Sequence, residues 1–120
     1  MIRSKYFAES EFTALGCSLQ DMQQDLMDML DLARGLAGIP FILTSAYRDP
    51  IKNIQVGGVG NSAHMKGRAV DIRCNNGSER WLIVVNAINA GFKRIGIGKG
   101  FVHLDNDKTL PHPVIFDYYK

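Results

Sequence analysis

Apolar residues recur at helical spacing in two segments of the chain. The first segment starts after Ser18, a residue typical of an N-cap, and Gly38 and Pro40 end it. Its apolar positions repeat every third or fourth residue: Met22, Leu26, Met29, Leu30, Ala33 and Leu36. The second helix is predicted from the turn at residues 75–77 to Gly91, with Ser78 as its cap. Its inward positions are predicted to be Trp81, Leu82, Val85 and Ile88.

Short β-rich segments predict the strands. Residues 41–45 indicate a buried strand, and residues 68–72 alternate between small or apolar and polar positions. Residues 94–98 and 101–105 predict a hairpin joined through Lys99 and Gly100, and a last short strand is expected near residues 114–116. Asp49 and Pro50 open a short helical turn, before a Gly-rich loop over about residues 54–66. This order predicts an α+β fold with a small, mostly antiparallel sheet flanked by helices.

The length and the net charge of the chain disfavour several classes of protein. A chain of 120 residues suits one domain, residues 1–120, and no repeat or linker divides it. The net charge is only +2 and the basic residues are scattered, so we expect no nucleic-acid binding. The longest apolar run, residues 81–85, is too short to span a bilayer, and no secretory signal is visible. We expect a monomer away from the membrane, with Cys17 and Cys74 as free thiols.

Two histidines and one aspartate form a candidate metal site. His64 is predicted on the loop and Asp71 on the strand that follows, and Gly67 permits the reversal between them. His103 lies on the apolar strand at residues 101–105. Two imidazoles and one carboxylate leave a coordination position open for water, as in catalytic zinc sites. The same donors also occur in non-haem Fe(II) oxygenases, but the two predicted helices and few strands disfavour the double-sheet barrel of those enzymes.

The residues around these ligands resemble a known family. The string Ser62-x-His64-x-x-Gly67-x-Ala69-x-Asp71 matches the signature of the zinc D-Ala-D-Ala carboxypeptidase family. That family includes phage endolysins that cut L-Ala-D-Glu bonds and murein endopeptidases, and it shares its fold with the Hedgehog signalling domain. Residues 44–48, Thr-Ser-Ala-Tyr-Arg, resemble the family's "SxYR" strand end. Residues 6–12 and 57–62 resemble its small, phage-associated branch, so the similarity spans about residues 5–107.

The resemblance implies a Hedgehog-like zinc peptidase that hydrolyses a peptidoglycan stem peptide at a D-Ala-D-Ala or L-Ala-D-Glu bond. It makes His64, Asp71 and His103 the Zn²⁺ ligands. Arg48 would face the substrate, where it either stabilises an oxyanion or holds a carboxylate; a surface ion pair with Asp49 or Glu79 is its alternative. Ser62, and Asn61 beside it, would contact the substrate. Such an enzyme acts on the cell wall, as a phage lysin, a virion-associated protein or a secreted protein.

One departure from the family concerns the general base. Carboxypeptidase members carry a Glu or Asp three residues before the third ligand, where this chain has Gly100. Asp105 shares a strand face with His103, so we expect it to act either as the base or as a partner that orients the imidazole. The missing carboxylate also leaves open a non-catalytic, zinc-containing module that binds cell-wall peptides or a protein.

Overall fold

A computed structural model describes residues 1–119 of the chain. The helices are α1 (Glu9–Thr13), α2 (Gln24–Ala37), α3 (Pro50–Gln55) and α4 (Gly77–Asn89), with 3₁₀ turns η1 (Leu19–Asp21) and η2 (Ala63–Lys66). The strands are β1 (Leu43–Ser45), β2 (Ala69–Arg73), β3 (Arg94–Gly98), β4 (Phe101–Asp105) and β5 (Val114–Asp117).

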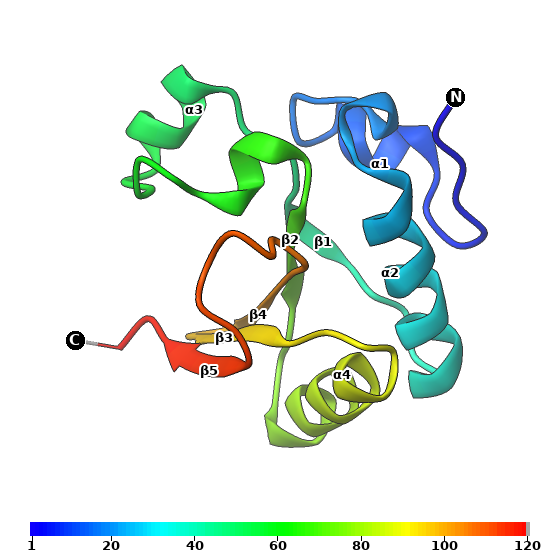
Figure 1. The fold of residues 1–120 in the computed structure, drawn as a ribbon. Coiled ribbons are helices and arrows are strands. Elements are labelled where there is room, and N and C mark those ends of the chain that lie inside the picture. Colours follow the sequence, from blue (N-terminus) through cyan, green and yellow to red (C-terminus); the bar gives the residue numbers. More distant parts are fainter. Residues whose placement is uncertain (120) are drawn as a thin grey trace.

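The strands form one sheet in the order β1-β2-β4-β3-β5, with helices packed around it (Figure 1). Three of the four strand pairs are antiparallel, and β5 runs parallel to β3. The parallel pair is possible because residues 106–113 cross the end of β3, where Arg94 pairs with Asp105 of β4 on one side and with Val114 of β5 on the other. The predicted α+β class, with a mostly antiparallel sheet, is confirmed.

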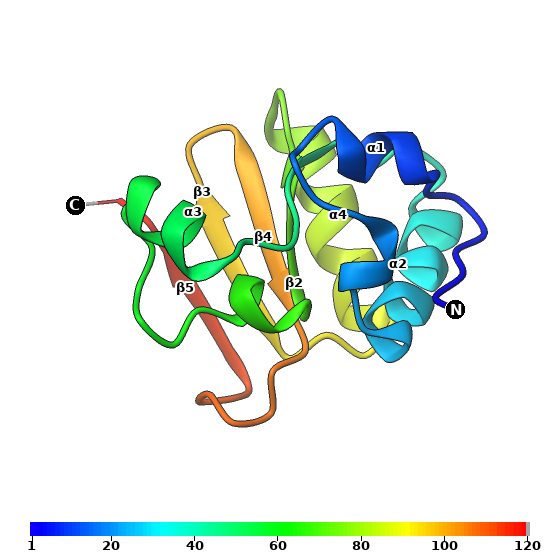
Figure 2. The ribbon, with the colours of Figure 1, turned by 90° about the horizontal axis from the view of Figure 1, so that it is seen from above.

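The two faces of the sheet have different chemistry. On one face, apolar side chains pack into the core with α2 and α4: Val70, Ile72, Ile95, Val102 and Leu104. The alternate residues of the same strands point to the opposite face, because successive side chains of a strand alternate. The segment that contains α3 and η2 lies over this second face (Figure 2). The polar residues of β2 and β4 are therefore gathered between the sheet and η2.

The prediction of one continuous first helix is wrong, because the structure has two separate elements there, η1 and α2. Ser18 caps η1, where its hydroxyl accepts a hydrogen bond from the Gln20 N–H, but the backbone is extended at Met22 and α2 begins at Gln24. The break lets the Gln23 N–H donate to the Gly67 carbonyl at 3.0 Å. This long-range bond joins the start of α2 to the reversal beside the predicted metal ligands. Leu36, expected in the core, is exposed.

The second helix lies where it was predicted, but its N-cap residue and its buried face differ from the prediction. Asn76, not Ser78, is the N-cap, and its side chain accepts a hydrogen bond from the Glu79 N–H at 2.8 Å. Trp81 is 63% exposed and Ile88 is also exposed, while Ile83 and Ala87 are buried. The small Ala87 side chain on this face allows close packing, and the large Trp81 ring lies outside.

The state of the two cysteines agrees with expectation. Cys17 and Cys74 are both free thiols. Among the described residues, none of the helices combines the length and apolar character that crossing a membrane requires.

Candidate metal centre

His64, Asp71 and His103 converge from three different elements, η2, β2 and β4. Each offers one ligand atom, and the three atoms lie within 4.8 Å of one another. Asp71 Oδ1 is 3.0 Å from His103 Nδ1 and 3.3 Å from His64 Nε2. The two imidazole nitrogens are 3.3 Å apart. Three donors so close together can share one ion and leave a further coordination position on the groove side.

Local backbone geometry explains why these side chains meet. Asp71 and His103 are directly opposite in the antiparallel register of β2 and β4, so their side chains share a face. His64 lies on η2, and Gly67 ends that turn in the left-handed conformation at φ +69°. Ser62 begins the turn, because its hydroxyl accepts a hydrogen bond from the His64 N–H at 3.2 Å. The η2 turn, the reversal at Gly67 and the strand β2 thus bring His64 and Asp71, which are seven residues apart in the sequence, into one site.

The remaining ring nitrogens of both histidines have hydrogen-bond partners. His64 Nδ1 lies 2.7 Å from the Ala46 carbonyl oxygen, and His103 Nε2 lies 2.6 Å from Asp105 Oδ2. Both partners are acceptors, so each ring donates its N–H to them and turns its lone pair toward the centre. Metal-bound histidines in proteins typically show this arrangement. The donor set therefore fits Zn²⁺, with His64 bound through Nε2 and His103 through Nδ1.

The electrostatics of the centre favour a dication. Burial opposes ionisation of Asp71, but hydrogen bonds to His103 and His64 outweigh it and hold the Asp71 pKa below its ordinary value. Burial likewise disfavours the charged form of His103, but the bonds to Asp105 and Asp71 raise its pKa overall. The imidazole of His103 lies between two carboxylates, and this negative surrounding suits a bound cation.

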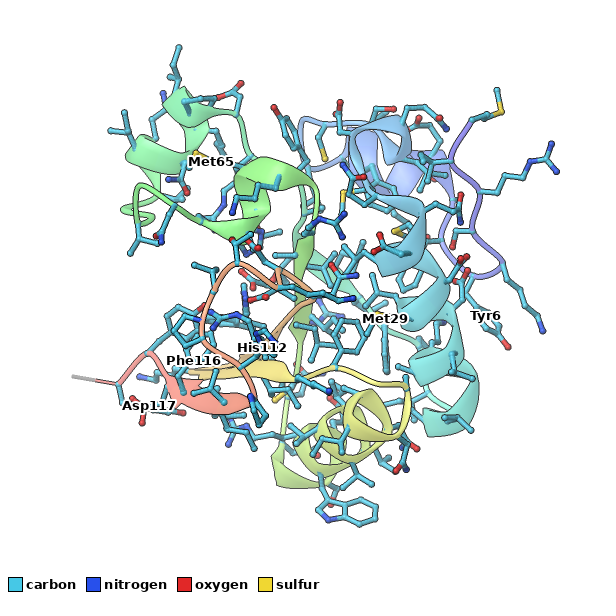
Figure 3. All side chains as sticks on the ribbon, viewed as in Figure 1. Tyr6, Met29, Met65, His112, Phe116 and Asp117 are labelled. Carbon is cyan, nitrogen blue, oxygen red and sulfur yellow. The ribbon has the colours of Figure 1, made fainter. Side chains whose placement is uncertain are left out.

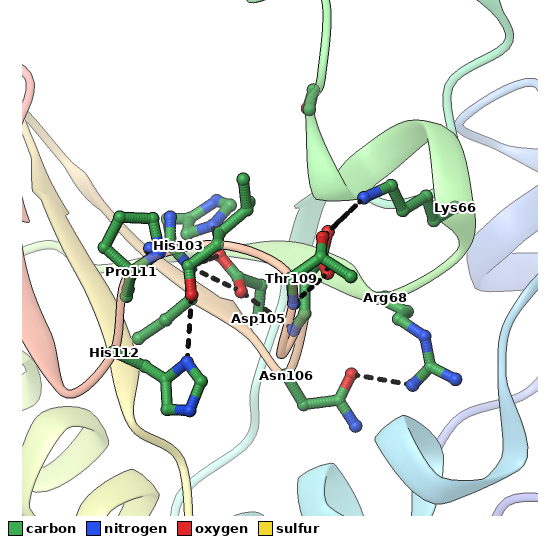
Figure 4. Close-up of polar contacts among 12 residues, drawn as sticks. Lys66, Arg68, His103, Asp105, Asn106, Thr109, Pro111 and His112 are labelled. Carbon is green, nitrogen blue, oxygen red and sulfur yellow. Dashed lines mark hydrogen bonds and ion pairs between the residues drawn. The ribbon is translucent and has the colours of Figure 1, made fainter.

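Asp105 is buried at one end of this network (Figure 4). Its oxygens accept hydrogen bonds from His103 Nε2 at 2.6 Å, Arg94 Nε at 2.9 Å and the Asp107 N–H at 3.1 Å. Asp105 therefore contacts the edge of the imidazole that carries Nε2, and the ligand atom Nδ1 is at another position of the ring. This geometry favours the orienting role of Asp105, and its role as general base stays a prediction.

Arg94 is a site residue that the sequence analysis missed. It lies opposite Asp105 in the β3–β4 hairpin and pairs with both carboxylate oxygens of Asp105, at 2.9 and 3.1 Å. The predicted hairpin contained the signal, because a hairpin joined through Lys99 and Gly100 places residues 94 and 105 opposite one another.

Arg48 faces the same groove as the metal ligands. This groove has a volume of about 700 Å³, and its lining includes His64, Asp71 and His103. Arg48 Nη2 is 3.5 Å from Ser62 Oγ, and burial lowers the Arg48 pKa, partly offset by the Asp71 charge. Within residues 1–119, Arg48 Nε has no hydrogen-bond partner and its guanidinium forms no ion pair. The guanidinium is therefore available to a substrate.

Ser62 and Asn61 differ in position. Ser62 is buried, lines the groove and caps η2, so its hydroxyl already has a structural partner in the His64 N–H. Asn61 is exposed, and the described residues that line the groove do not include it. Lys52, Phe116 and Tyr118 also line the groove and carried no signal in the sequence patterns. Burial raises the pKa of Tyr118 to about 12, and the Asp71 charge adds to the rise.

Comparison with known families identifies the chain. A family model described as Peptidase M15 matches residues 5–105, which include all three candidate ligands. The chain belongs to the peptidase M15 family. No curated protein matches the chain. Peptidases of the M15 family are zinc-dependent metallopeptidases, and the His-Asp-His cluster of this M15 peptidase has the donors that such an ion requires. The chain thus belongs to a family of zinc peptidases, the D-Ala-D-Ala carboxypeptidase-like M15 family.

Proposed function

We propose that this M15 peptidase hydrolyses a peptide bond in the stem peptide of peptidoglycan, at a D-Ala-D-Ala or an L-Ala-D-Glu bond. The observation that carries the proposal is the Arg48 guanidinium, which has no ion-pair partner among the described residues and lines the same groove as His64, Asp71 and His103. A guanidinium binds a carboxylate through two parallel hydrogen bonds. Both stem-peptide bonds have a free carboxylate on the residue that follows the scissile carbonyl.

The chain's own residues would divide the chemical work. His64, Asp71 and His103 would hold the Zn²⁺ ion, whose chemistry would be to lower the pKa of a bound water toward ~7 and to polarise the scissile carbonyl. Arg48 either holds the substrate carboxylate or stabilises the developing oxyanion. The groove wall formed by η2 and the second sheet face limits the direction from which the peptide enters.

We infer that Asp105 is a positioning residue in this reaction. Its bond to His103 Nε2 keeps the His103 ring turned with Nδ1 toward the centre, and Arg94 neutralises the charge of Asp105. Outer-shell carboxylates of this kind hold the tautomer and the orientation of a ligating imidazole.

The test is hydrolysis of purified, cross-linked peptidoglycan fragments by the zinc-loaded protein, with mass spectrometry of the products. We expect one stem-peptide bond to be cut and the activity to be lost in His64→Ala. The Trp81→Ala variant is the matched control, because Trp81 is exposed on α4 and belongs to the other side of the sheet. Hydrolysis that persists in His64→Ala would refute the proposal.

A second candidate function is a non-catalytic module that binds wall peptides. The observation that favours it is Gly100, which occupies the hairpin turn at φ +91° where carboxypeptidase members carry a carboxylate. Stoichiometric zinc together with peptide binding and no cleavage in the same experiment would support this alternative over the peptidase.

A further inference from the structure

The groove has an aromatic wall beside the metal centre. In the strand register, Asp71, His103, Gly96 and Phe116 form one row across β2, β4, β3 and β5. In the next row, Gly98 is opposite Phe101, and Tyr118 follows β5. Phe101, Phe116 and Tyr118 all line the groove, and we call these three residues the aromatic platform. The ligand His103 and the platform therefore share one face of the sheet.

Two glycines of β3 make room for the platform. A Cβ at Gly96 would lie 2.7 Å from the Phe116 ring and 2.9 Å from the Tyr118 ring. A Cβ at Gly98 would overlap the Phe101 ring. The rings of the platform consequently pack directly against the backbone of β3 at Gly96 and Gly98, and this contact restricts their movement toward the sheet.

The platform is continuous with the metal centre. The His103 ring centroid is 5.6 Å from that of Phe116 and 6.2 Å from that of Tyr118. Within the platform, Tyr118 is 5.1 Å from Phe101 and 5.7 Å from Phe116. The Arg94 guanidinium lies over the Phe116 ring, 5.3 Å from the ring centre. Tyr118 is 47% exposed, so the platform is open to a ligand in the groove.

Phe116 and Tyr118 of the platform lie toward the opposite edge of the sheet from Arg48, and Phe101 lies on the central strand β4. Arg48 follows β1, the first strand in the sheet order. Phe116 lies on β5, the last strand, and is labelled in Figure 3. The metal ligands Asp71 and His103 lie between them on β2 and β4. A substrate that crosses the centre thus has a cation on one side of the scissile bond and aromatic rings on the other. β5 also lies outside the region that the family model matches, residues 5–105.

We propose that the aromatic platform binds a pyranose ring of the glycan strand, so that the enzyme cuts the first bond of the stem peptide, L-Ala-D-Glu. This inference rests on the proposed function. The apolar C–H face of a pyranose packs on aromatic rings, which offer a large, rigid apolar surface. Arg48 would then hold the free carboxylate of D-Glu on the far side of the centre.

The length of stem peptide between the sugar and each bond decides between the two candidate bonds. An extended residue spans at most about 3.3–3.6 Å, so one or two residues cover the 5.6 and 6.2 Å between the ring centre of the ligand His103 and the ring centres of Phe116 and Tyr118. In the stem peptide, L-Ala is joined to the sugar through the lactyl group of muramic acid, and its carbonyl belongs to the first bond. The D-Ala-D-Ala bond lies about three residues further along, on the order of 10 Å from the first bond. Only cleavage at the first bond lets the sugar reach the platform.

The experiment compares two substrates that differ only in the sugar, N-acetylmuramyl-L-Ala-D-Glu and N-acetyl-L-Ala-D-Glu. We expect kcat/KM of the zinc-loaded wild type to be about tenfold higher for the substrate with the sugar, because that sugar packs on the platform. In Tyr118→Ala this ratio should fall toward one, and in Tyr118→Phe it should be kept. The exposed Trp81→Ala variant should change neither rate nor ratio, and thermal melting verifies that each variant is folded.

The outcomes separate this inference from the proposed function. Equal kcat/KM for both substrates in the wild type would overturn the inference without any variant. Cleavage of a D-Ala-D-Ala stem peptide with the first bond left intact would also overturn it, while the proposed function would stand. If zinc-loaded protein hydrolysed none of these substrates, the proposed function itself would fail.

Discussion

The Asp105→Asn variant separates the two roles considered for Asp105. In the wild type, Asp105 Oδ2 is 2.6 Å from His103 Nε2, and Oδ1 is 2.9 Å from Arg94 Nε. Both neighbours are donors, and an amide has only one acceptor oxygen and two N–H donors. In the variant, either His103 loses its acceptor or the guanidinium of Arg94 loses its partner.

The expected magnitudes differ for the two roles. If Asp105 orients His103, the variant should bind zinc about 10–100-fold more weakly, which corresponds to about 1.4–2.8 kcal/mol. Once zinc is saturating, kcat should then recover most of its wild-type value. If Asp105 is the general base, kcat should fall by about 10²–10⁴-fold even at saturating zinc. We expect the first pattern, because the Asp105 carboxylate is already occupied by three donors.

The assay measures zinc affinity by competition with a chromophoric chelator and kcat on a stem peptide at saturating zinc. Asp31→Asn is the matched control, since Asp31 accepts hydrogen bonds from the Ser4 hydroxyl and the Lys5 and Tyr6 N–H groups, none of which lines the groove. The control should lower stability and leave zinc affinity unchanged. Unchanged zinc affinity in Asp105→Asn, together with a kcat loss above about 100-fold at saturating zinc, would refute the orienting role.

Three further predictions concern stability. A Cβ at Gly67 would overlap the backbone carbonyl of Asp21 at φ +69°, whereas Gly38 has φ +70° and open space around it. Chemical denaturation should therefore show a loss of about 1–2 kcal/mol for Gly38→Ala and a larger loss for Gly67→Ala, and only the latter should weaken zinc binding. Equal losses would contradict the overlap. Removal of zinc by a chelator should lower Tm, and added zinc at about 100-fold above Kd should restore about 2.7 kcal/mol; a Tm indifferent to zinc would count against the site. Burial opposes ionisation of Asp107, but the hydrogen bonds from Lys66 and Thr109 outweigh it and lower the Asp107 pKa. The Lys66–Asp107 pair therefore stabilises the fold at neutral pH, and this contribution is lost as pH falls below about 4. The Tm difference between wild type and Lys66→Met should shrink in acid, and a constant difference would exclude this linkage.

Much of the local structure was predictable because its causes lie within a few residues. The cap at Asp49, the left-handed glycines at Gly38 and Gly67 and the β3–β4 hairpin all depend on short-range geometry. The meeting of His64 and Asp71 also follows from local pattern, because a loop, a glycine and a strand position one against the other. The contact of Asp105 with His103 was predictable too, because the two residues share a face of β4. The approach of His103 to Asp71 and the hydrogen bond from His64 to the Ala46 carbonyl required the structure, since the partners come from separate strands or strand ends.

Tertiary packing decided the features that depend on contacts between distant residues. At the break before α2, the Gln23 N–H bonds to the Gly67 carbonyl. The helical period of the sequence could not predict this long-range bond. The outward position of Trp81 depends on which face of α4 packs against the sheet. The parallel pairing of β5 places Phe116 beside His103, and this neighbourhood comes from the path of residues 106–113. The sequence alone therefore determined which residues are candidate metal ligands, because the motifs that carry them are short. The tertiary structure decided how these residues meet and how the groove around them is lined, because strand register and helix packing bring them together from all parts of the chain.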